Sequence, residues 1–227
     1  MTTLIAFFDK LGPEMLQRTY EHVYLTFLAV VIATAIALPL GVFLARSSWT
    51  RFTNVVMGAA GIIQTVPSLA LIAFIVLLFA LIALPTLGAF PALVALVLYG
   101  LLPILRNTYT GIRQVDPSVL DVATGMGMTP HQVLFQVELP LSLPVIMAGI
   151  RISTVWTIGV ATLCGLIGAG GLGDLIIKGL RSIQMDYLIA GTVPAGLLAI
   201  LFDTILAWLE RWLSPVTLSE ASGEASA

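Results

Sequence analysis

The sequence predicts an all-α integral membrane protein with about five transmembrane helices. The chain of 227 residues is 59% hydrophobic and 10% charged, with a mean hydropathy of +1.05, whereas soluble domains carry about 25% charged residues. Its apolar residues form uncharged runs at least as long as the roughly 20 residues that a helix needs to cross a bilayer. We expect an interfacial segment at 1–22, a transmembrane domain at 23–210 and a short disordered tail at 211–227.

Charge and cysteine content exclude several other classes of protein. The net charge of −2 lacks the basic footprint of a nucleic-acid-binding protein. The single cysteine, Cys164, allows neither an internal disulfide nor a multi-cysteine metal site. There is no glycine loop ending in Lys-Ser or Lys-Thr, and neither histidine has a metal-ligand partner at suitable spacing. We therefore expect no enzyme activity, no metal and no bound cofactor in this chain.

The first span is predicted at 23–45, a run without charge after His22. Small residues recur at every fourth position along it, and such a ridge lets a second helix approach closely. The ridge consists of Ala29, Ala33, Ala37, Gly41 and Ala45. Pro39 lies within the same run, where we expect a kink.

The uncharged run 52–105 is long enough for two spans. Its turn is predicted at 85–88, where the sequence reads PTLG. The first of the two spans, about 55–84, is longer than a bilayer requires. We expect its beginning to lie along the interface, and the helix to enter the bilayer near Gln64 or Pro67. The second span is predicted at about 88–105.

Two further spans are predicted in the second half of the chain. The fourth, at 141–168, is interrupted only by Arg151, which we expect to snorkel or to pair with a carboxylate. A glycine-rich turn and a short amphipathic surface helix follow at 167–186. The fifth span, at 187–209, carries Asp203, for which a helix-terminal or ion-pair role is expected.

The polar stretch between the third and fourth spans, about 114–140, is predicted to form a helical knob outside the membrane. Asp116-Pro117 is typical of a helix start, and Thr129-Pro130-His131-Gln132 adds a capping box. Gly125 and Gly127 permit a bend between the two short helices. Leu139-Pro140 is expected to end the second one. The alternative is that this stretch only packs on the inner face of the protein itself.

The same stretch resembles the signature loop of binding-protein-dependent ABC importer permeases. That signature is Glu-Ala-Ala, three residues, Gly, nine residues, Ile, one residue and Leu-Pro. The matching positions here are Asp121, Val122, Ala123, Gly127, Val137, Leu139 and Pro140. Asp, Val and Val replace Glu, the first Ala and Ile. The runs Gln64-Thr65-Val66-Pro67-Ser68 and 168–173 look like permeases of the glycine betaine, carnitine and choline class.

The resemblance implies a fold like that of methionine-importer permeases, with a coupling-helix loop on the cytoplasmic side. It implies a bacterial inner-membrane protein with its N-terminus outside and its C-terminus in the cytoplasm. The implied partners are two cytoplasmic ATPase subunits that bind ATP and Mg, a second permease subunit (identical or related) and an extracytoplasmic substrate-binding protein. The implied function is ATP-driven import of an osmoprotectant, with the 121–140 loop receiving the ATPase motion.

Six polar, aromatic or helix-breaking residues are candidates for the solute pathway. They are Gln64, Pro67, Ser68, Ser153, Trp156 and Thr157. Gln64 beside a proline faces either a water-filled path or another helix through a hydrogen bond. Trp156 offers either a cation–π surface to a quaternary ammonium solute or ordinary packing.

Two other functions fit parts of the sequence. One is the permease of a methionine or other amino-acid ABC importer, because the glycine-rich run 168–173 also occurs in that class. The other is a stand-alone secondary transporter or channel. Such proteins often contain internal repeats and intramembrane carboxylates, whereas this chain has no repeat and only Asp203 in a span.

Overall fold

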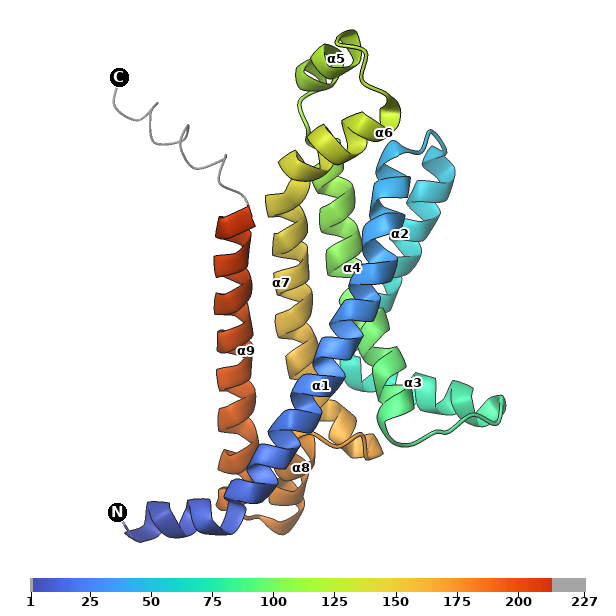
Figure 1. Ribbon diagram of the computed structural model, residues 1–227. Coiled ribbons are helices and arrows are strands. Elements are labelled where there is room, and N and C mark those ends of the chain that lie inside the picture. Colours follow the sequence, from blue (N-terminus) through green and yellow to red (C-terminus); the bar gives the residue numbers. More distant parts are fainter. Residues whose placement is uncertain (1, 214–227) are drawn as a thin grey trace.

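The computed structural model describes residues 2–213, and every regular element in that range is a helix (Figure 1). The longer helices are α1 (Thr2–Arg46), α2 (Thr50–Thr65), α3 (Ser68–Leu81), α4 (Ala89–Arg113), α7 (Leu139–Leu163) and α9 (Met185–Leu213). The shorter ones are α5 (Pro117–Gly125), α6 (Pro130–Val133), a π-helical segment at Leu134–Glu138, a 3-10 turn at Cys164–Ile167 and α8 (Leu172–Ser182).

Four stretches of helix are long and apolar enough to cross a membrane. They are Asp9–Arg46, Ala89–Arg113, Pro130–Ile167 and Met185–Leu213. The pair α2 and α3 reaches the same criterion together and is bent by 106° at its break, which gives up to five spans in the described residues. The predicted all-α membrane fold is therefore confirmed. Most of the predicted tail, residues 214–227, lies outside the described part of the chain.

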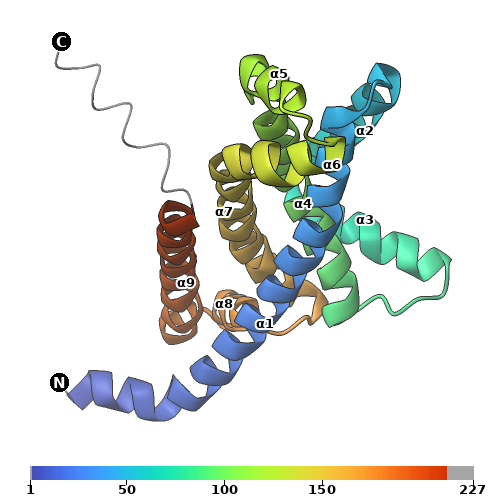
Figure 2. The same cartoon turned by 45° about the horizontal axis from the view of Figure 1, so that its top comes forward.

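The small-residue ridge of α1 packs against α4, as predicted. Ala33 and Ala37 are fully buried in one apolar cluster with Leu105. At Gly41 an added Cβ would lie 2.7 Å from the Cβ of Thr108, so the Thr108 side chain packs directly against the backbone of α1. α1 remains one helix across residue 22, although its first part runs at an angle to the rest (Figures 1 and 2). An interfacial role for that first part stays a prediction.

The broken span differs from the prediction in one respect, namely which of its two helices leaves the bundle. The break lies at Val66-Pro67, where both residues have extended ψ angles of 125° and 136°. However, α2 runs beside α1, and α3 is the half that turns sideways past α4 and projects outward (Figure 1). The physical reason is that Ala60 of α2 is buried in one cluster with Leu44 of α1. Ala60, in the part of the span that was expected to lie along the interface, therefore serves helix packing.

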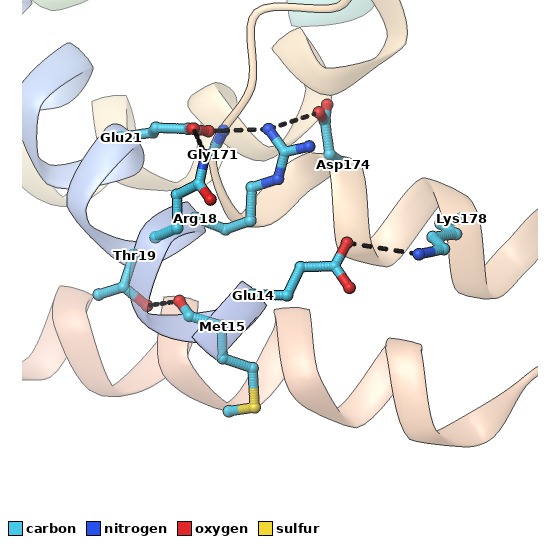
Figure 3. A network of polar contacts seen from close by, with 9 residues as sticks. Glu14, Met15, Arg18, Thr19, Glu21, Gly171, Asp174 and Lys178 are labelled. Atoms are coloured by element: carbon cyan, nitrogen blue, oxygen red, sulfur yellow. Dashed lines mark hydrogen bonds and ion pairs between the residues drawn. The ribbon is translucent and has the colours of Figure 1, made fainter. Parts of the chain in front are cut away.

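A network of charged side chains ties α1 to α8 at the end of the molecule opposite α5 (Figures 1 and 3). The Arg18 guanidinium lies 2.8 Å from Glu21 and 3.1 Å from Asp174, and Lys178 lies 3.3 Å from Glu14. Burial raises the pKa of Asp174, an effect that Arg18 partly offsets. The predicted glycine-rich turn and amphipathic helix are confirmed, because α8 follows the turn and buries one face.

Candidate functional site

The knob begins where the sequence predicted, at Asp116. Its carboxylate accepts a hydrogen bond from the backbone N–H of Ser118 at 2.8 Å, and Pro117 occupies the first turn of α5. This bond stabilises the charged form and lowers the pKa of Asp116. Because α5 is only nine residues long, its end depends on this cap more than the end of a long helix would.

The second predicted helix start is also confirmed. The Gln132 side chain accepts from the Thr129 N–H at 2.8 Å, and the Thr129 hydroxyl accepts from the Gln132 N–H at 3.4 Å. Gly127 lies between the two helices with φ +82°. That left-handed conformation strains any residue with a Cβ. Of the two glycines expected at the bend, Gly125 instead forms the last residue of α5.

The predicted end of the second helix at Leu139-Pro140 is wrong. Helix continues from α6 through the π-helical segment into α7, and the Leu139 N–H bonds to the carbonyl of Leu134, five residues back. The widened π turn comes directly before Pro140, which has no N–H to donate and whose ring would crowd a regular α-helical turn. The knob is thus joined to the fourth span by unbroken helix.

α5 presents an apolar stripe to the surroundings. Val119, Val122 and Met126 are 40%, 62% and 71% exposed, and their i, i+3, i+7 spacing places them on one side of the helix. This stripe was not predicted, although its spacing is visible in the sequence. Exposed apolar surface of this kind is a feature of protein–protein contact sites.

The signature residues divide into exposed and packed positions. Asp121, Gly127 and Pro140 are exposed, whereas Ala123 is buried. Val137 and Leu139 are partly buried.

One connection to the knob was missed by the sequence analysis. Arg46, the last residue of α1, donates from Nη2 to the Pro130 carbonyl at 3.0 Å, and its Nε lies 3.5 Å from Glu138 Oε2. Arg46 and Glu138 are 92 positions apart in the sequence, so no local pattern predicts their pairing.

Two of the six pathway candidates, Ser68 and Trp156, meet at a hollow. It has a volume of about 440 Å³ and is also lined by Tyr99, Gly159 and Thr162. The rings of Tyr99 and Trp156 lie 6.4 Å apart. Two aromatic rings and hydroxyl groups on the wall suit a solute that combines a cation with apolar groups.

The other four candidates lie elsewhere. Ser153 and Thr157 are buried where α7 meets α4, and the Ser153 hydroxyl donates to the Gly100 carbonyl at 2.8 Å. Gln64 is partly buried, and its Nε2 has no hydrogen-bond partner among the described residues. Pro67 is exposed at the bend between α2 and α3.

Arg151 pairs with carboxylates, as predicted. Its guanidinium donates to both oxygens of Asp203, at 3.0 and 3.1 Å, and to Glu210 at 3.2 Å. Glu210 was not anticipated as a partner. Arg151, Asp203 and Trp156 line a second hollow of about 370 Å³, so Trp156 contributes to both hollows on this side of α7.

Comparison with known proteins places the chain in a family. The profile of the binding-protein-dependent transport system inner membrane component matches residues 37–217. The choline transport system permease protein OpuBB of Bacillus subtilis (strain 168) is 47% identical over 215 residues, which is 95% of each chain. The carnitine transport permease protein OpuCB of Listeria monocytogenes is 42% identical and covers 97% of this chain and 98% of that one.

Solved structures show the same fold. The inward-facing MetNI methionine ABC transporter contains a chain that matches with a TM-score of 0.78 at 22% identity, over 88% of this chain and 96% of that one. An amino acid ABC transporter crystallised with histidines matches with a TM-score of 0.74 at 20% identity, over 89% and 95%. From its sequence relatives, the chain belongs to the binding-protein-dependent transport system inner membrane components and is the permease subunit of an ABC importer.

Proposed function

We propose that this permease imports osmoprotectants of the glycine betaine, carnitine and choline class. The observation that carries the proposal is the identity of 47% and 46% to two Bacillus subtilis permeases named for these solutes, over 95% of each chain. The methionine and amino-acid transporters that share the fold are only 20–22% identical, which supports no choice of solute. All three osmoprotectants carry a quaternary ammonium group.

The complex would contain two permease subunits, two ATPase subunits that bind ATP and Mg, and a substrate-binding protein. In this arrangement the knob lies on the cytoplasmic side, the C-terminus is cytoplasmic and the N-terminus is outside. The ATPases act on the 121–140 loop and switch the spans between inward-open and outward-open states. The exposed stripe of α5 supports this role for the knob, since it offers an apolar surface to a protein partner.

Within the knob, the signature residues would act in two ways. Asp121 and Gly127 are exposed and would lie at the ATPase contact, with the stripe residues Val122 and Met126 beside them. Ala123, Val137 and Leu139 would support that surface from within, because they are wholly or partly buried. Pro140 would set the junction with α7.

For the solute pathway, we favour the hollow beside Trp156. The faces of Trp156 and Tyr99 would attract the quaternary ammonium group by cation–π interaction, and the Ser68 hydroxyl would contribute polarity. Gln64 and Pro67 would act through the bend between α2 and α3. Ser153 and Thr157 would hold α7 against α4 rather than touch the solute.

The knob contact is tested by placing a charge on the stripe. Val122→Glu and Met126→Glu put a carboxylate into the proposed apolar contact, and we expect loss of ATPase co-purification and of substrate-stimulated ATP hydrolysis. Thr50→Glu is the matched control, because Thr50 is exposed at the start of α2, outside the knob. Equal retention of the ATPase by all three variants would exclude this surface.

Gly127→Trp, which spoils the bend, should separate hydrolysis from transport.

The solute is tested by uptake. Cells with and without this chain are given labelled betaine, choline or methionine at high and low osmolarity. We expect chain-dependent uptake of betaine or choline. Chain-dependent uptake of methionine alone would instead support an amino-acid importer.

A further inference from the structure

The end of α1 makes polar contacts with the knob through the side chain of Arg46. Its Nη2 donates to the Pro130 carbonyl at 3.0 Å, and its Nε lies 3.5 Å from the Glu138 carboxylate. Within residues 2–213, the side-chain hydrogen bonds and ion pairs that join the 116–138 region to the rest of the chain both come from Arg46. One guanidinium therefore clamps the two ends of the α6 and π-helical stretch.

Glu138 depends on this arginine. It is only 7% exposed, and its Oε2 is buried without a hydrogen-bond partner, so the charge of Arg46 is the compensation that the structure provides for it. A buried carboxylate is strongly destabilised when its cationic partner is removed. Glu138 is also the last residue of the π-helical segment, directly before α7, so the ion pair lies at the junction between knob and span.

The knob has two routes into the membrane domain. The first is the backbone, because helix is continuous from Pro130 to Ile167. The second is Arg46, which leads into α1. Ala33 and Ala37 hold α1 tightly against α4, so a force applied at the end of α1 reaches α4 as well.

We propose that Arg46 is a positioning residue that makes α1 follow the knob, so that one displacement of the knob moves α1 and α7 together. The inference rests on the proposed function, in which ATPase subunits act on the knob. Without the Arg46 contacts, the knob would still carry α7, but α1 would lag behind. ATP would then be hydrolysed with less solute moved for each ATP consumed.

The experiment uses the full permease with its ATPase and binding protein in liposomes, and measures solute uptake and ATP hydrolysis together. For Arg46→Gln we expect the ratio of transport to hydrolysis to fall about five-fold or more, the lower end of typical coupling between sites. Arg51→Gln is the matched control. Arg51 is exposed five residues further along the chain, and its substitution should leave the ratio unchanged.

Rescue separates coupling from simple loss of structure. Glu138→Arg combined with Arg46→Glu restores an ion pair of reversed polarity and should recover part of the ratio that each single change loses. If Arg46→Gln does not assemble, Arg46→Lys keeps the charge but lacks the forked guanidinium, and a lowered ratio is still expected.

An unchanged ratio in an assembled Arg46→Gln or Arg46→Lys complex would overturn the inference. Failure of the wild-type chain to couple with any ATPase would instead overturn the proposed function.

Discussion

At the scale of single residues, glycines set the helix contacts, because the neighbouring helices occupy the space that a side chain would need. In α7, a Cβ at Gly149 would lie 2.6 Å from the Cβ of Asn107 and 2.9 Å from the Pro103 carbonyl. Gly159 of the same helix has nothing within 4 Å of the corresponding position. A methyl group would therefore clash with α4 at Gly149 but would fit at Gly159.

We expect Gly149→Ala to destabilise the permease by about 1–3 kcal/mol, because overpacking forces α4 and α7 apart. Gly159→Ala should be neutral or mildly stabilising, since alanine is about 1 kcal/mol better than glycine within a helix. Thermal unfolding of the purified protein in detergent measures both. Equal melting temperatures for the two variants would contradict the close α4–α7 contact.

The Asp116 cap is a second property of one residue, and it depends on pH. Its pKa is lowered by the bond from the Ser118 N–H, so the cap contributes fully above the ordinary value of about 4. That contribution is lost as pH falls through the lower value in the folded state. We expect the start of α5 to fray in acid, seen as a lower protection factor for the Ser118 amide relative to its intrinsic exchange rate at the same pH. Asp116→Asn keeps a capping acceptor that does not titrate and should show no such acid-dependent step.

At the scale of elements, the π-helical segment Leu134–Glu138 decides how the knob is oriented. A π-bulge is a helical turn with one residue more than α-helical geometry requires. Inserting one alanine after the exposed residue Gln136 adds a residue beyond the one that the π turn already absorbs, and it should rotate the knob by about 100° relative to α7. Asp121 and the apolar stripe would then face a new direction.

We therefore expect the insertion after Gln136 to abolish ATPase-coupled transport while the permease still folds and inserts. Uptake and co-purification with the ATPase measure the first effect, and thermal unfolding measures the second. Gln136→Ala is the control that keeps the number of residues, and it should transport normally. Transport by the insertion variant would show that the orientation of the knob is not critical.

The elements also show what the sequence could predict. Both knob helix starts were predictable because their caps involve residues two or three positions apart, Asp116 with Ser118 and Thr129 with Gln132. The end at Leu139-Pro140 was not, because the π turn that accommodates Pro140 leaves no signal in residue propensities. The orientation of α2 depends on the distant contact of Ala60, and the Arg46 contacts are likewise long-range.

At the scale of the whole molecule, α9 is attached to α7 by the Arg151 ion pairs. The side chains of Arg151, Asp203 and Glu210 are 31%, 42% and 25% exposed. An arginine without a partner in the middle of a span costs about 2.5–3.5 kcal/mol on insertion scales. The two carboxylates therefore serve mainly to lower the free-energy cost of placing the Arg151 charge within a membrane span.

We expect Asp203→Asn together with Glu210→Gln to destabilise the protein by about 1–3 kcal/mol, less than the full insertion value because the pairs are partly exposed. Adding Arg151→Met removes the unpaired charge and should restore most of the stability. Thermal unfolding of the wild type, the double variant and the triple variant measures this. A triple variant no more stable than the double one would argue against charge compensation.

The 106° break between α2 and α3 also bears on how the chain enters the membrane during synthesis. The two helices have 16 and 14 residues, which gives lengths of about 24 and 21 Å, while the hydrocarbon core is about 30 Å thick. Neither half is long enough for the translocation machinery to release into lipid as an independent segment. We therefore expect this part of the chain to reach its final place after α1 and α4 have been inserted and offer a surface to receive it.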